Sequence, residues 1–175
     1  LANQNFHAEG DEFEPDSRLG LQFAATLGIP LGESGLRLQP EISYIQKGYM
    51  LEFEFLGMTI EDEFIVNYLE VPIMLQYVFG QEDGFFGFAQ AGPSVGYAMS
   101  GKSKSGDEEE DIDFDEIMYE RLEIGAQFGV GIGTQAGPGQ IYLDARYLLG
   151  LTNLNGDEDF EDITATNRGI GISVG

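Results

Sequence analysis

The sequence has no cysteine and no tryptophan, and 8 of its 175 residues are basic. The absence of cysteine excludes a disulfide scaffold and any thiolate metal site. With 31 acidic residues and a formal net charge of −23, nucleic acid is not an expected partner, because phosphate binding needs clustered Lys and Arg. No run of about 18 apolar residues occurs, so no transmembrane helix is expected. Residues 1–10 also lack the basic start and apolar core of a signal peptide.

Alternation of apolar and polar residues is the dominant pattern, and helical periodicity is nearly absent. A period of two places successive side chains on opposite faces of a sheet, so each such segment predicts a β-strand. Leu1 to Phe6 is expected to be the end of a further strand, which makes about eight in a single domain over residues 1–175. The first and last of these strands are expected to be truncated. The seven clearest segments are 19–29, 36–44, 69–79, 87–99, 121–132, 141–149 and 169–174.

The connections between these strands alternate in length. Three are short and carry residues that favour tight turns, whereas four are long and hold most of the acidic residues. Successive connections of an up-and-down sheet lie at opposite ends, so all the long, acidic loops are expected at one end. This plan is typical of outer-membrane barrels. The short connections are 31–35, 80–84 and 136–139, and the long ones are 7–17, 48–63, 100–117 and 153–164.

The polar set of the alternation indicates which face of the sheet turns inward. It is rich in glycine, which weakens a solvated strand but leaves room inside a narrow barrel. It also carries charges of both signs, which we expect to form an interior network, because an unpaired buried charge costs about 3–5 kcal/mol. The apolar set then faces lipid, with Tyr and Phe near the strand ends. The glycines are Gly92, Gly96, Gly125, Gly129, Gly131 and Gly133, and the charges are Glu70, Arg121, Glu123, Asp144 and Arg146.

Four short motifs carry a resemblance to a known family. They are 68–77 (YLEVPIMLQY), 39–44 (QPEISY) followed by Lys47-Gly48, 91–97 (AGPSVGY), and Arg146-Tyr147 followed by 150–154 (GLTNL). Together with the opening Leu1-Ala2-Asn3, these motifs resemble strands of the PorT-like outer-membrane β-barrel family of Bacteroidota. Along the chain they follow one another in the same order as in that family. The resemblance covers nearly the whole chain. It implies an outer-membrane location and supplies no catalytic residues.

The sequence gives little support for catalysis. His7 is the only histidine and falls in an expected loop, so a Ser–His–Asp arrangement is not expected. Glu70 and Glu123 would suit an acid–base pair, but a structural charge network is the favoured interpretation. We therefore predict no enzymatic activity. A membrane-embedded enzyme at the loop rim, using Ser94 or Ser173, is a further hypothesis.

Two acidic clusters are candidate cation sites. Asp111, Asp113 and Asp115 alternate along the chain, and Asn155, Asp157 and Asp159 form a second cluster. Carboxylate oxygens suit a hard cation such as Ca²⁺, although neither cluster meets the full EF-hand pattern. A solvated, self-repelling loop is the alternative, and the acid excess also suits a saline habitat or surface solubility. Loosely bound Ca²⁺ is the one ligand expected.

The sequence thus predicts an all-β fold, a closed antiparallel up-and-down transmembrane β-barrel of about eight strands. Such a barrel is just wide enough for side chains to fill it, so a wide pore is not expected. The expected location is a bacterial outer membrane, and the expected role is structural or in interactions, within a larger assembly. Expected partners are outer-membrane lipid, lipopolysaccharide and other outer-membrane proteins. A soluble lipocalin-like carrier, with the apolar set inside, is the alternative.

Overall fold

The chain forms one antiparallel sheet. The computed structural model describes residues 2–8, 16–55, 58–80, 84–106, 108–114, 116, 119–155 and 165–175. No helix in these ranges is long and apolar enough to cross a membrane. The strands are β1 (Ala2–Ala8), β2 (Asp16–Gly20), β3 (Gln22–Thr26), β4 (Ile29–Pro30), β5 (Leu36–Phe55), β6 (Met58–Gly80), β7 (Phe85–Ser105), β8 (Glu108–Ile112), β9 (Leu122–Ala136), β10 (Gly139–Gly150) and β11 (Ala165–Val174).

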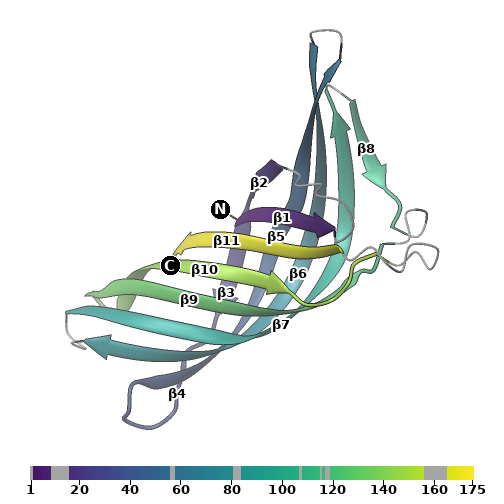
Figure 1. The fold of residues 1–175 in the computed structure, drawn as a ribbon. Coiled ribbons are helices and arrows are strands. Elements are labelled where there is room, and N and C mark those ends of the chain that lie inside the picture. The colour runs from purple at the N-terminus through teal and green to yellow at the C-terminus, as the bar shows by residue number, and fades with distance from the viewer. Residues whose placement is uncertain are drawn as a thin grey trace.

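Neighbouring strands follow one another up and down around a common interior (Figure 1). The order of pairing is β2-β1-β11-β10-β9-β7-β6-β5-β3, while β4 also pairs with β5, β8 with β7, and β2 with β5. Short turns lie at one end of the strands, where Gly32, Gly35 and Gly137 adopt positive φ angles of 82°, 76° and 63°. Such angles are disfavoured for residues with a Cβ atom. The predicted antiparallel up-and-down architecture is confirmed.

The prediction of a closed barrel of about eight strands is wrong in two respects. The described sheet has 11 strands, because the expected strand 19–29 is divided into β2, β3 and β4 and because β8 is added. The sheet is also not closed along its length. β1 pairs with β2 and β11 only from Ala2 onward, opposite Gly20 and Gly171. Among the described strands, β3 therefore pairs with β5 alone, and only Asp16↔Met50 and Ser17↔Tyr49 link β2 to β5.

Two expected loops are instead largely strand. β5 and β6 stay paired as far as Phe55↔Met58, through most of segment 48–63. β7 continues to Ser105 and pairs with β8 inside segment 100–117. We call residues 49–55, 58–65, 101–105 and 108–112 the sheet extension, which projects beyond the other strands in Figure 1. The acid density suggested loops, but the alternation of apolar and acidic residues in 51–55 also has the period of two that is typical of a strand.

The two faces of the sheet are inverted relative to a soluble barrel. On β6, Leu69, Val71 and Ile73 are 39%, 43% and 47% exposed, whereas Glu70 between them is 3% exposed. The same alternation places Ile124 and Phe128 on the outside and Glu123 and Gln127 inside. The predicted inversion is confirmed, and a soluble carrier with the Leu, Ile and Val set in its core is excluded. The outer surface also includes Leu75, Val95, Tyr97, Val130, Ile132, Leu143, Tyr147, Ile170 and Ile172.

Glycines on β9 make room for bulky groups in the interior. A Cβ atom at Gly129 would lie 3.0 Å from Cγ of Arg146, and one at Gly131 would collide with the ring of Phe88. The predicted role of these glycines in a narrow interior is therefore confirmed. Because their neighbours include backbone oxygens as well as rings, larger residues there would force the strands apart.

Candidate functional site

Side chains fill the interior of the barrel in successive layers. Along β10, Tyr142, Asp144, Arg146 and Leu148 point inward in turn, from the short-turn end to the loop end. Tyr142 belongs to an aromatic group with Phe86 and Phe88, whose ring centroids are 6.0–6.4 Å apart. Two polar networks follow, and then an apolar cluster. The apolar cluster comprises Ile45, Val66, Tyr68, Ala98, Phe114 and Leu148.

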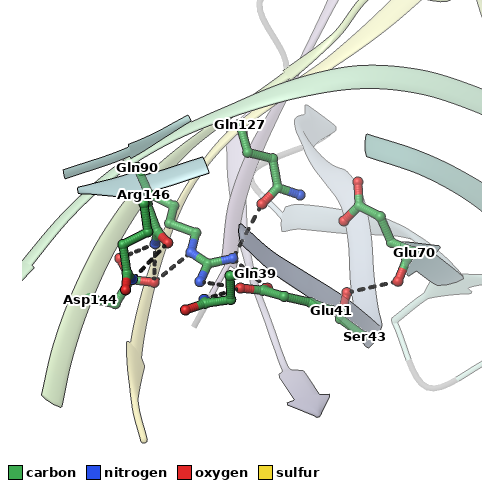
Figure 2. A network of polar contacts seen from close by, with 9 residues as sticks. Gln39, Glu41, Ser43, Glu70, Gln90, Gln127, Asp144 and Arg146 are labelled. Carbon is green, nitrogen blue, oxygen red and sulfur yellow. Dashed lines mark hydrogen bonds and ion pairs between the residues drawn. The ribbon is translucent and has the colours of Figure 1, made fainter. Parts of the chain in front are cut away.

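The first polar network centres on Arg146 (Figure 2). Its guanidinium donates from Nη1 and Nη2 to the two carboxylate oxygens of Glu41 at 2.6 and 2.9 Å, and from Nε to Asp144 at 2.5 Å. Gln90 donates to both oxygens of Asp144 at 3.0–3.1 Å, and Gln39 donates to Glu41 at 2.6 Å. The side chains of Glu41 and Asp144 are 0% exposed. This bidentate geometry is the strong form of an arginine–carboxylate contact.

The second network centres on Lys47. Its ammonium lies 2.9 Å from Oε2 of Glu123 and 3.5 Å from Oε1 of Glu70, and 4.7 Å from the ring centroid of Tyr68. Asn167 donates to Glu123 at 3.0 Å. Each network thus sets one cation against two carboxylates. Breaking such a buried set by removing one member is far more costly than the net stability that the set contributes.

The apolar cluster closes the loop end of the interior. Phe114 and Tyr119, from the segment between β8 and β9, pack against each other with ring centroids 5.3 Å apart and the ring planes tilted by 30°. The hydroxyl of Tyr119 lies 2.5 Å from that of Tyr68. The backbone amide of Glu120 donates to the carbonyl of Leu154 at 3.1 Å, which ties this segment to the one after β10. Two interior cavities lined by described residues measure about 10 and 50 Å³. A larger one of about 460 Å³ adjoins the second at the short-turn end and shares Arg37 and Phe86 with it. The described residues leave no aqueous channel of the kind found in wide barrels.

The structure brings together four of the five charged residues expected in the interior. Glu70 and Glu123 lie in the Lys47 network, and Asp144 lies with Arg146. The structure places Arg121 at the loop end, with its guanidinium 4.9 Å from the ring centroid of Phe114. Lys47, Glu41, Gln90 and Gln127 also belong to these networks, although they were not among the predicted members. Glu41 lies next to the outward-facing Ile42 in an expected strand, so the alternation alone would have placed its side chain in the interior.

The candidate cation ligands are not brought together in the described residues. Asp111 lies on β8 and Asp113 just after it, and both are exposed. Asp115, Asp157 and Asp159 lie outside the described residues, as does the side chain of His7. Among the residues that are described, no three His, Asp or Glu side chains are placed to share a metal ion.

The sheet extension carries exposed ion pairs. Lys102 and Lys104 of β7 both contact the carboxylate of Glu109 on β8. Hydrogen bonds from Lys102 and then Lys104 lower the pKa of Glu109 below its usual value of 4.5, and Glu109 in turn raises the pKa of Lys102. The neighbouring acids Glu108, Glu110 and Asp111 are exposed. This end of the molecule therefore presents a strongly negative surface.

The comparison with protein families decides the classification. The model of the outer membrane protein beta-barrel domain matches residues 2–156. The chain belongs to this family. As an outer-membrane β-barrel domain protein with an apolar outer surface, it is an integral protein of the bacterial outer membrane. No curated protein is significantly similar to it.

Solved structures with a related fold include two of Ail, the attachment invasion locus protein of Yersinia pestis. One is 16% identical, with a TM-score of 0.38, and the match covers 99% of this chain and 91% of that one. The other, in complex with the heparin analogue sucrose octasulfate, is 12% identical at the same TM-score and covers 99% and 92%. At these values we transfer no function from Ail to this outer-membrane β-barrel domain protein.

Proposed function

We propose that this protein is a non-enzymatic anchor that presents an acidic surface outside the cell and takes part in a larger outer-membrane assembly. One observation carries the proposal: the interior is filled, while the sheet continues past the apolar belt as a charged extension. A barrel that only holds a surface in place needs no channel through its interior. An extended, paired sheet outside the membrane suits contact with another macromolecule.

The filled interior argues against transport. Ion pairs occupy the middle of the barrel, and the rings of Phe114 and Tyr119 cover them at the loop end. Substantial rearrangement of both layers would be needed to admit a solute. Selective pores instead line a continuous aqueous path with polar side chains.

The chemistry of the interior also argues against catalysis. Ser94 lies near Lys47 and Glu123 in the small cavity of the second network. A serine nucleophile needs a base beside it, but the ammonium of Lys47 is held by two carboxylates. The side chains are also buried inside the barrel, out of reach of a substrate at the loop rim.

The motifs in segments 68–77 and 39–44 support a finer assignment to the PorT-like barrels of Bacteroidota, and we propose that membership. The acidic face of β8 further suggests loose association with divalent cations, Ca²⁺ included, which would link it to the phosphates of lipopolysaccharide. Asp111, Asp113, Asp115, Asp157 and Asp159 are the proposed ligands. The proposed protein partners are other outer-membrane proteins.

Crosslinking in native membranes, followed by denaturing electrophoresis, tests the assembly. We expect the wild type to be recovered in a complex larger than its own 19.2 kDa. A variant with Glu108→Gln, Glu110→Gln and Asp111→Asn should lose that complex. The matched control Glu33→Gln, an exposed acid in a turn at the opposite end, should keep it. A wild type that crosslinks only as a monomer would overturn the proposed assembly role.

A further inference from the structure

A small cavity separates the two polar networks of the interior. Its polar lining consists of Lys47, Glu70, Ser94, Glu123, Gln127 and Asn167. Its volume is about 10 Å³, which is the space that a single water molecule needs. The cavity is too small for an organic ligand.

Two residues that line this cavity each have a buried polar atom with no hydrogen-bond partner among the described residues. These atoms are Oε2 of Glu70 and Nε2 of Gln127, whose residues are 3% and 1% exposed. Oε1 of Gln127 faces Nη1 of Arg146 at 3.5 Å, which directs the amide nitrogen the other way. Figure 2 shows that nitrogen on the side of Glu70. A buried polar atom without a partner costs about 1–3 kcal/mol, so an occupant that satisfies both atoms is strongly favoured.

We infer that the cavity binds one water molecule, which accepts a hydrogen bond from Nε2 of Gln127 and donates one to Oε2 of Glu70. Ser94 and Glu123, in the same lining, offer further oxygen acceptors. Buried waters typically make about three hydrogen bonds, and this site supplies that number.

The charges at the site select a neutral ligand. A cation would face the N–H group of Gln127 and the ammonium of Lys47, which lies within 3.5 Å of both Glu70 and Glu123. An anion would face those two carboxylates. Water is the small ligand that offers both a donor and an acceptor.

The bound water joins the two networks into one. The path runs from Glu41 through Arg146 and Gln127 to the water, and then to Glu70 and Lys47. These residues lie on four different strands, β5, β6, β9 and β10. A perturbation at Gln127 is therefore transmitted to Glu70 without a direct contact between them.

A crystal structure of the wild-type protein, at a resolution that shows ordered water, is the first test. We expect density about 2.7–3.2 Å from both atoms. Replacing Na⁺ by K⁺ or choline at constant ionic strength should leave the urea midpoint unchanged. An empty cavity, or a midpoint that depends on the cation, would overturn the inference.

Unfolding in detergent micelles supplies a second test that does not depend on crystals. The variants are Gln127→Met, Glu70→Gln and their combination. Because both residues share one water, we expect the double variant to be more stable than additivity predicts, by about threefold or more in the unfolding constant. Gln90→Met is the matched control, since Gln90 is a buried glutamine that bonds directly to Asp144. The effects of Gln90→Met and Glu70→Gln on the unfolding constant should be additive within about twofold. If the effects of Gln127→Met and Glu70→Gln are equally additive, the two residues do not share a water molecule.

Discussion

Replacing Arg146 by Met tests the interior network most severely. The substitution keeps much of the aliphatic stem but removes three hydrogen bonds to carboxylates, at 2.5, 2.6 and 2.9 Å. Glu41 and Asp144 then remain at 0% side-chain exposure without their cation. Removing one partner of a buried ion pair costs about 3–5 kcal/mol, which is a factor of about 10² to 10⁴ in the unfolding constant.

The assay is urea unfolding in detergent micelles, followed by far-ultraviolet circular dichroism. With a slope of about 2 kcal/mol per molar urea, the midpoint should fall by about 1.5–2.5 M. Arg168→Met is the control, because Arg168 is exposed on the outer face of β11. Because Arg168 pairs with Leu149 near the loop end of β10, where charge on the lipid-facing surface costs little, the change should be no more than about 1 kcal/mol.

A triple variant separates unpaired charge from lost packing. Glu41→Gln, Asp144→Asn and Arg146→Met together remove all three charges, so no buried ion is left without a partner. We expect this variant to regain most of the stability that Arg146→Met loses. A loss below about 1 kcal/mol for Arg146→Met would refute the reasoning, because it would mean that the carboxylates reach water.

Three other predictions follow from the same interior and surface. Gly131→Leu should lower stability by about 1–3 kcal/mol or prevent folding. The control Gly28→Ala, with no atom within 4 Å of the added Cβ, should be nearly neutral. Equal urea midpoints for the two variants would contradict the narrow interior. The purified protein in planar lipid bilayers should show no stable single-channel current, and a reproducible conductance would contradict the filled barrel. Because the pKa of Glu109 is lowered in the folded state, its ion pairs should stabilise the β7–β8 pair fully above about pH 4.5 and progressively less as the pH falls through the lowered value. A carbon NMR titration should show that pKa returning to its usual value in a Lys102→Gln, Lys104→Gln variant, and an unchanged pKa would refute the pairing.

The sequence predicts the orientation of the strands well because a period of two leaves one choice for each strand. Once Leu69 and Val71 face outward, Glu70 must face inward. The glycines at 129 and 131 then indicate a crowded interior, as the structure shows. Local patterning was sufficient for these features because each depends only on the side chains of a single strand.

Features that depend on pairing between distant segments were harder to predict. The acid-rich segment 48–63 forms strands because β5 and β6 pair through it, which no local count of charge reveals. Lys47 was not predicted as an interior cation, because its partner Glu123 lies 76 residues away in the sequence. Glu123 itself was expected inside. Arg121 directly precedes β9, where alternation no longer fixes its direction, and it lies over Phe114.

The inverted surface is tested most directly by single nitroxide labels, which the cysteine-free chain allows at any chosen position. Labels introduced by Val71→Cys, Ile124→Cys and Ile172→Cys should collide mainly with lipid-soluble oxygen in bilayers. A label introduced by Ser103→Cys in the sheet extension should collide mainly with a water-soluble nickel complex. If the first three labels respond to the nickel complex instead, the apolar face does not contact lipid and the membrane assignment is wrong.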